Sequence, residues 1–151
     1  MKYLSPIGVL TGQTEDDVLT GLVFSAEEGA EGPEGSEEVI RWLDRYFAGE
    51  RPDPGALRMR PAGTDFQRRV WEKVLEIPYG ETRTYGALAA QLAQELGRPM
   101  SARAVGAAVG KNPIAVVIPC HRVVGAGGRL TGYAWGTERK KWLLEFEEET
   151  K

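Results

Sequence analysis

The sequence is very poor in cysteine, histidine and long apolar segments, and each shortage excludes a class of protein. One cysteine, Cys120, allows no intrachain disulfide, and with one histidine it cannot complete the usual four-ligand zinc site. The longest purely apolar run, residues 114–118, is far shorter than the roughly 20 residues that span a bilayer, and no secretory pattern follows Met1. We therefore expect a cytoplasmic protein that needs no metal, cofactor or membrane, and in which Cys120 is either inert packing or a reactive thiol.

Acidic and basic residues are distributed unevenly along the chain. The net charge of −3 hides a balance of −8 in residues 1–50, which hold 3 Lys/Arg against 11 Asp/Glu, and of +5 in residues 51–151, which hold 16 against 11. Between Arg68 and Lys141 the count is 12 basic against 5 acidic residues. A basic surface on the second half permits binding to DNA phosphates, although an ordinary solvated surface explains the same pattern.

Residues 1–55 are expected to form a small domain built from a sheet and a helix. Residues 4–10 and 18–24 have the composition of strands, and a loop rich in Gly, Glu and Pro follows at residues 27–35. Ser36 then opens a helix whose apolar side chains suit packing on a small sheet: Val39, Ile40, Trp42, Leu43, Tyr46 and Phe47. Residues 49–55 read as a linker, so we place the domain boundary between residues 50 and 62.

Residues 62–151 are expected to form a second, mainly helical domain, which gives an α+β fold overall. A capping box at residues 64–67 begins one helix. Thr84 then precedes a helix over residues 85–95, residues 97–99 turn the chain, and Ser101 caps a helix over residues 102–109. A helix, a short turn and a second helix form the helix-turn-helix pattern of many DNA-binding proteins.

The second of these two helices consists largely of small residues, and Arg103 is its only long side chain. The small residues are Ala102, Ala104, Gly106, Ala107 and Ala108, with Gly110 just beyond. Tight packing against another helix would explain them. A shallow approach to a DNA minor groove, with Arg103 entering the groove or the base stack, would explain them equally well. The two explanations are compatible if they apply to different faces.

The only cysteine and the only histidine, Cys120 and His121, are neighbours that follow Pro119. An ordinary thiol is only a few per cent thiolate at neutral pH, so a nucleophilic cysteine needs a base or a positive neighbour. Since consecutive residues of a strand point to opposite faces, we expect residues 114–118 to form a strand that ends in a turn at Pro119. The lack of a second cysteine argues against thioredoxin-like and two-cysteine peroxide chemistry, and a buried structural cysteine is the plain alternative.

Residues 118–124, with the sequence Ile-Pro-Cys-His-Arg-Val-Val, resemble the active-site signature of the O6-alkylguanine-DNA alkyltransferases, the methylated-DNA–protein-cysteine methyltransferases. Further segments resemble the same family in the same order: residues 63–75, 77–82, 84–85, 102–106, 111–113, 131–133 and 141–147. The resemblance covers about residues 62–148. The first 50 residues match none of its motifs.

This resemblance implies that the protein flips an O6-alkylated guanine out of double-stranded DNA and transfers the alkyl group irreversibly to Cys120, once per molecule. O4-alkylthymine is a second candidate lesion, and a monomer is expected. His121 would draw the thiol proton through a water, and Glu147 would orient His121. Asn112 would hold the loop near the active site, and Tyr133 would hydrogen-bond the base and relieve its developing charge.

The resemblance also assigns residues that contact the nucleic acid. Tyr85 would crowd the target phosphate, and Arg103 would fill the space left by the flipped base. The minor-groove contact would be lined by the small residues Ala102, Ala104 and Gly106. The base or its pocket would be bordered by Val123, Ala134 and Trp135. Without the resemblance, Arg103 reads as a phosphate contact, Asn112 as a turn former and Tyr133 as packing.

Three other functions compete with alkyl transfer. An alkyltransferase-like lesion sensor flips the base but lacks an acceptor cysteine, so Cys120 argues against it. A helix-turn-helix transcription factor would bind undamaged DNA sequence-specifically, and such proteins usually read the major groove with longer polar side chains. A thiol hydrolase would show turnover through an acyl intermediate.

Overall fold

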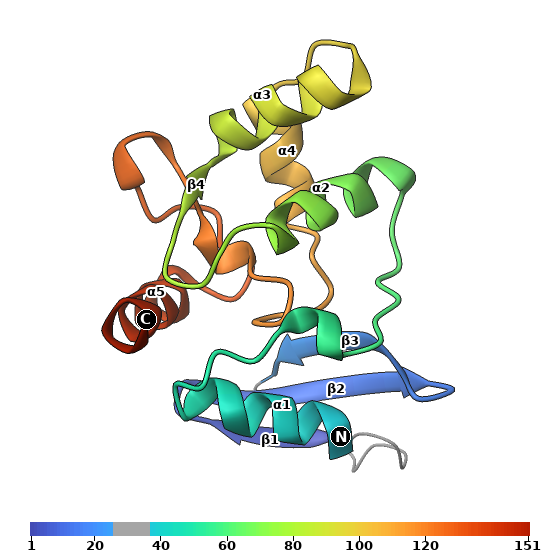
Figure 1. Cartoon of the computed structure of the whole chain (residues 1–151), viewed down its shortest axis with the longest axis vertical. Helices are drawn as coiled ribbons and strands as arrows, with labels where there is room; N and C mark the ends of the chain where they lie inside the picture. Colours follow the sequence, from blue (N-terminus) through green and yellow to red (C-terminus); the bar gives the residue numbers. More distant parts are fainter. Residues whose placement is uncertain (26–36) are drawn as a thin grey trace.

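The computed structural model describes residues 1–25 and 37–151 and shows an α+β fold, as the sequence predicts (Figure 1). One end holds an antiparallel sheet in the order β1-β2-β3 together with helix α1, and helices α2 to α5 lie beyond it (Figure 1). The strands are β1 (Lys2–Ser5), β2 (Gly8–Glu15) and β3 (Val18–Phe24). The helices are α1 (Glu37–Phe47), α2 (Asp65–Leu75), α3 (Tyr85–Leu96), α4 (Ala102–Val109) and α5 (Thr137–Thr150).

The prediction of a single strand over residues 4–10 is wrong, because the chain turns back at Pro6 and Ile7. β1 and β2 pair antiparallel, with Ser5 opposite Gly8. The Ser5 hydroxyl donates to the Gly8 carbonyl at 2.6 Å and accepts from the Ile7 amide at 3.2 Å, so a side chain closes the turn. Gly8 has a φ of +126°, a conformation that other residues rarely adopt. The strand predicted over residues 18–24 is confirmed as β3.

Helix α1 packs with the face that its sequence pattern predicts. Val39, Trp42, Leu43 and Tyr46 are buried, and Ile40 and Phe47 pack against the same core. The loop predicted for residues 27–35 and the cap predicted at Ser36 lie outside the described residues. After α1, residues 58 and 60 hydrogen-bond to Leu19 of β3, so the chain returns to the sheet before α2 begins. The division into domains at residues 1–55 and 62–151 remains a proposal.

The three helices that follow begin at the residues that the sequence predicts. Thr64 and Gln67 form the capping box of α2, with reciprocal bonds of 2.9 and 3.1 Å. Thr84 caps α3, and Ser101 caps α4. α4 buries Val105, Ala108 and Val109 on one side, while Ala102 and Arg103 are exposed. Close packing and an exposed face of small residues therefore occur together in α4.

The strand predicted over residues 114–118 is wrong. Only Ile114 forms a bridge, to Leu22 of β3, and the chain then turns through residues 115–117. Val116 has a φ of +68°, which is unusual for a β-branched residue. All five side chains are buried, so the apolar composition reflects burial of a turn rather than a strand. A short parallel pair, β4 (Arg83–Thr84) with β5 (Val123–Val124), lies beyond it. No helix in the described part of the chain has the length and apolarity to cross a membrane.

Candidate active site

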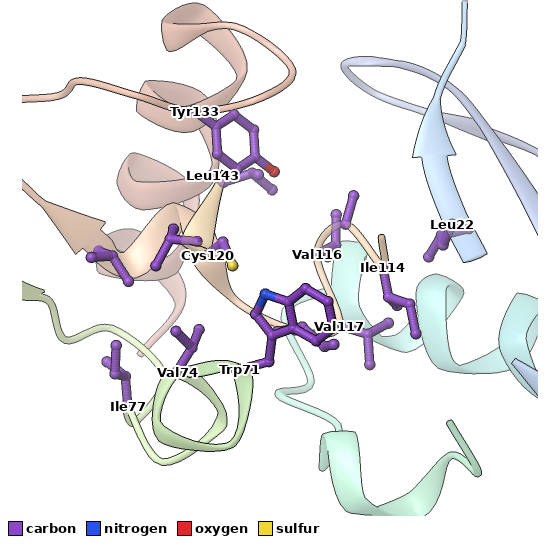
Figure 2. Close-up of a cluster of buried hydrophobic side chains, with 14 of the residues drawn as sticks. Leu22, Trp71, Val74, Ile77, Ile114, Val116, Val117, Cys120, Tyr133 and Leu143 are labelled. Atoms are coloured by element: carbon purple, nitrogen blue, oxygen red, sulfur yellow. The ribbon is translucent and has the colours of Figure 1, made fainter. Parts of the chain in front are cut away.

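Cys120 begins a single turn of 3-10 helix, Cys120–Arg122, immediately after Pro119, so the turn expected at Pro119 is confirmed. Its side chain is 3% exposed and belongs to a buried cluster that contains Trp71 and Tyr133 (Figure 2). Burial raises the pKa of the Cys120 thiol to about 12, although a hydrogen bond with Asn112 and the charge of Lys140 favour the thiolate. The resting cysteine is therefore a thiol, and its reaction requires a base.

His121 is fully buried and is paired with Glu147. Its Nε2 lies 2.6 Å from Oε2 of Glu147, which presents the carboxylate to this ring nitrogen. The Nδ1 atom is also buried and has no hydrogen-bond partner among the residues that the structure describes. Since the carboxylate holds the proton on Nε2, Nδ1 carries the free lone pair. His121, which follows Cys120 in the sequence, therefore has a basic Nδ1 atom and a ring that is held in a fixed orientation.

Glu147 accepts hydrogen bonds from groups on several segments of the chain. Arg122 donates through Nε to Oε1 at 2.7 Å and through Nη2 to Oε2 at 3.1 Å, and the hydroxyl of Tyr46 donates to Oε2 at 2.6 Å. The amide of Gly80 is 3.4 Å from Oε1. Burial opposes ionisation of this carboxyl, but His121 and Arg122 outweigh it and hold the pKa of Glu147 well below its usual range. Glu147 is therefore a buried carboxylate that joins α1, α5 and the Cys120 turn.

The buried charges around Glu147 also determine the protonation state of His121. Burial lowers the pKa of His121, and the positive charges of Arg122 and Lys140 act in the same direction, although Glu147 opposes them. Since Arg122 already neutralises Glu147, a protonated His121 would add an uncompensated buried charge. His121 is thus neutral at pH 7 and able to accept a proton.

We expect the free energy of unfolding to fall as the pH is lowered below about 6.5, the ordinary pKa of histidine. Below that pH the unfolded chain binds a proton on His121 that the folded chain does not, because the folded pKa is lowered. The loss is at most about 1.4 kcal/mol per pH unit. Denaturant unfolding at about pH 7.5 and about pH 5.5 measures it, since ordinary carboxyls titrate below this window.

The control for this pH dependence is His121→Gln, which removes the only histidine of the chain. Its free energy of unfolding should change much less across the same window. A wild-type protein that is equally stable or more stable at the lower pH would contradict the neutral state of His121.

Asn112 fixes the turn that leads to Cys120. Its Nδ2 donates to the Ile118 carbonyl at 3.0 Å, and its Oδ1 accepts from the Ile114 amide at 2.9 Å, so one buried amide closes both ends of residues 114–118. The Asn112 amide also favours the thiolate form of Cys120 and so opposes the effect of burial on the pKa of the thiol. Asn112 thus forms the turn and holds the loop before Cys120 through the same two hydrogen bonds.

Lys140 of α5 supports the opposite side of the site. Its ammonium donates to the carbonyls of Val123 at 2.5 Å and Thr131 at 2.8 Å, and its side chain is fully buried. Burial lowers the pKa of Lys140 to about 8, although Cys120 opposes the shift. Because Lys140 holds both carbonyls, it ties the segment after Cys120 to the loop that carries Tyr133.

Tyr133 and Trp135 form an aromatic pair beside Cys120. Their ring centroids are 5.3 Å apart at an angle of 70°, an edge-to-face contact. The Tyr133 hydroxyl is buried without a hydrogen-bond partner in the described part of the chain, and burial raises its pKa, so it remains a neutral donor. Ala134, between the two aromatic residues, is exposed. Val123 and Tyr133 are thus buried near Cys120, whereas Ala134 faces outward.

The residues expected to contact DNA meet at a surface groove. Tyr85, Ala102, Arg103 and Gly106 line it together with parts of residues 84–86 and 126–127, whereas Ala104 does not. The Tyr85 hydroxyl donates to the Thr131 carbonyl at 3.0 Å, and a Cβ added to Gly106 would lie 3.6 Å from the Tyr85 ring. Arg103 is exposed and forms no ion pair within the described ranges. The groove joins α3, α4 and the loop after Cys120.

Sequence reasoning assigned no role in the site to Arg122 or Lys140, and it assigned Tyr46 only a role in packing. Charged residues usually lie at the protein surface. Because Lys140 lies in the basic run Arg139-Lys140-Lys141, the sequence favours an exposed position for it. The available signal was helical spacing, since Lys140, Leu143 and Glu147 recur at intervals of three and four residues, and these are the buried residues of α5.

Comparison with known proteins identifies the family to which this chain is similar. Residues 65–149 match the family model described as 6-O-methylguanine DNA methyltransferase, DNA binding domain. The chain is 46% identical over 150 residues to the methylated-DNA–protein-cysteine methyltransferase of Mycolicibacterium paratuberculosis, covering 95% of this chain and 88% of that protein. It is 50% identical over 153 residues to the protein of the same name from Methanosarcina acetivorans, covering 96% and 95%. The chain belongs to the methylated-DNA–protein-cysteine methyltransferase family.

Solved structures extend the likeness to the fold. The O6-methylguanine methyltransferase of Mycobacterium tuberculosis superposes with a TM-score of 0.81 at 44% identity, covering 99% of this chain and 92% of that one. A structure of the Mycobacterium tuberculosis protein in complex with DNA gives a TM-score of 0.84 over the same coverage. Both alignments include the N-terminal sheet, the region in which the sequence shows no family motif.

Proposed function

We propose that this protein repairs DNA by transferring an alkyl group from the O6 atom of a flipped guanine to Cys120, irreversibly and once per molecule. The observation that carries the proposal is the placement of the only cysteine next to a neutral, buried histidine whose Nε2 is held by Glu147 at 2.6 Å. The substrate is double-stranded DNA, O4-alkylthymine is a second candidate lesion, and the protein acts as a monomer without a cofactor.

In the proposed reaction the Cys120 proton passes through a water to Nδ1 of His121. The thiolate then attacks the alkyl carbon, a C–S bond forms, and the C–O bond breaks with its electron pair on the guanine. The Tyr133 hydroxyl donates a hydrogen bond that stabilises this charge. The guanine becomes neutral by taking up a proton from water, and His121 returns the proton that it accepted to water. The resulting thioether has no good leaving group and no second thiol to attack it, so the protein acts once.

Flipping the base is assigned to the groove that joins α3 and α4. The exposed small residues of α4 allow the backbone to approach the minor groove closely, and Arg103 has no competing partner among the described residues. Arg103 would enter the space that the base leaves. Tyr85, which is anchored through its hydroxyl to Thr131, would press on the phosphate of the flipped nucleotide.

Arg103→Ala is expected to slow repair of duplex DNA by about 100-fold, a few kcal/mol of lost flipping energy, while transfer from the free base O6-benzylguanine changes by less than about twofold. The free base needs no flipping, so only the duplex reaction depends on the inserted side chain. Single-turnover rates on the two substrates give the comparison.

Arg98→Ala is the matched control, because Arg98 is an exposed arginine in the turn between the same helices. It removes the same charge without removing a side chain that lines the groove. Equal losses on duplex DNA and on the free base, or equal losses for the two variants, would refute the flipping role of Arg103.

Binding to damaged and undamaged duplexes separates this proposal from its rivals. A lesion sensor would bind the lesion without any change in its own mass, and a transcription factor would prefer a particular undamaged sequence. The direct test of the proposal is the mass of the Cys120 peptide after incubation with damaged DNA. A chain that stays unmodified would overturn it.

A further inference from the structure

Arg139, in the first turn of α5, connects the N-terminal hairpin to the loop beside Cys120. Its Nε donates to the Ile7 carbonyl at 2.9 Å, and its Nη1 donates to the Trp135 carbonyl at 3.1 Å. The guanidinium also lies over the Phe24 ring, 4.7 Å from the centroid. One partly buried side chain therefore contacts the β1–β2 turn, the end of β3 and residue 135.

The guanidinium of Arg139 lies close to the backbone of Gly8 in this hairpin. A Cβ added to Gly8 would lie 2.9 Å from Nη2 of Arg139, and the φ of +126° at Gly8 is a conformation that favours glycine. A side chain at position 8 would displace Arg139. The lack of a Cβ at Gly8 therefore leaves room for the Arg139 guanidinium beside the β1–β2 turn.

Trp135 lies between the N-terminal sheet and the candidate active site. Its ring meets Phe24 edge-on with centroids 6.2 Å apart, and on the other side it meets Tyr133 at 5.3 Å. Tyr133 belongs to the same buried cluster as Cys120 (Figure 2). A series of contacts therefore runs from Phe24 through Trp135 and Tyr133 toward the sulfur, and Arg139 holds the backbone of Trp135.

We propose that Arg139 is a positioning residue that determines which alkyl groups fit beside Cys120, by holding Trp135 between Phe24 and Tyr133. The N-terminal sheet then takes part in substrate choice although it contributes no reacting group. Release of Trp135 enlarges the space available to a bulky alkyl group and matters little to a methyl group. This inference rests on the proposed alkyl transfer, because Trp135 affects selection only if Cys120 is the acceptor.

The test compares transfer from oligonucleotides carrying O6-methylguanine with transfer from those carrying O6-benzylguanine. In Arg139→Ala the ratio of benzyl to methyl rates should rise by about tenfold, which corresponds to about 1.4 kcal/mol. Trp135→Ala should raise the ratio at least as much. In the Trp135→Ala background, adding Arg139→Ala should change the ratio by less than about twofold, since Arg139 acts through Trp135.

Two further variants keep the test decisive. Lys141→Ala, at an exposed neighbour on α5, should leave the ratio unchanged, and Arg139→Lys should restore part of the wild-type ratio because it keeps a donor and a cation. Phe24→Leu replaces Arg139→Ala if that variant does not fold, and it should shift the ratio in the same direction. Methyl and benzyl rates that fall equally in Arg139→Ala, or additive effects in the double variant, would overturn the inference. Wild-type protein that transfers neither group would instead refute the proposed function.

Discussion

Cys120→Ala is expected to transfer no alkyl group at all, while its affinity for DNA stays within about threefold of wild type. The substitution removes the only sulfur nucleophile beside His121, and no second cysteine exists to replace it. The side chain is buried, and the proposed DNA contacts lie on the separate groove of α3 and α4, so binding does not depend on the thiol. Loss of the lesion from a labelled duplex measures transfer, and fluorescence anisotropy measures binding.

Cys120→Ser is the matched control for the chemistry, because it replaces the thiol with a hydroxyl of similar size in the same buried position. A hydroxyl is a much weaker nucleophile than a thiolate, so this variant should also fail to transfer while it folds and binds. A Cys120→Ala protein that still clears the lesion would show that the acceptor lies elsewhere. If the Cys120→Ala protein lost both DNA binding and transfer, Cys120 would instead have a structural role.

Glu147→Gln is expected to lower the free energy of unfolding by about 3–5 kcal/mol and the rate of alkyl transfer by about 100-fold or more. Glutamine keeps the shape but not the charge, so Arg122 remains buried without its counter-ion. The amide also presents no carboxylate to His121, so the tautomer with a free Nδ1 is no longer favoured. Denaturant unfolding and single-turnover transfer give the two values.

Glu145→Gln provides the control on the same helix, where an exposed glutamate forms only a weak ion pair with Lys141 at 3.9 Å. Its stability should change by less than about 0.5 kcal/mol. Tyr46→Phe removes one donor to Glu147 but leaves Glu147 paired with Arg122, so it should cost about 1–2 kcal/mol and keep most of the rate. A Glu147→Gln protein as stable as the Glu145→Gln control would contradict the role of Glu147 as a buried counter-ion.

Much of the helical part of the fold follows from local chemistry. Thr64, Thr84 and Ser101 cap their helices with side-chain bonds that reach only a few residues ahead, and the sequence window contains both partners. The hairpin over residues 2–15 and the turn over residues 114–118 could not be predicted in the same way. A buried turn and a buried strand have the same apolar composition, and only tertiary contacts such as Ile114 with Leu22 distinguish them.

The candidate site shows the same division between local and distant information. Scarcity drew attention to Cys120 and His121, and the family resemblance added Asn112, Glu147 and Tyr133. The partners of these residues come from distant segments: Tyr46 lies 101 residues from Glu147, and Arg139 lies 132 residues from Ile7. No sequence window contains such pairs, so the contribution of the N-terminal sheet to the site became visible only in the fold.

The central claim is that Cys120 is the acceptor of a single alkyl group. Mass spectrometry of the intact protein and of its peptides, after incubation with an oligonucleotide carrying O6-methylguanine, tests that claim directly. We expect one added methyl group on the peptide that contains Cys120, with modification that saturates at one per chain. If the protein bound the lesion but its mass stayed unchanged, the protein would be a lesion sensor rather than an alkyltransferase. A methyl group on another residue would contradict the assignment of Cys120 as the acceptor.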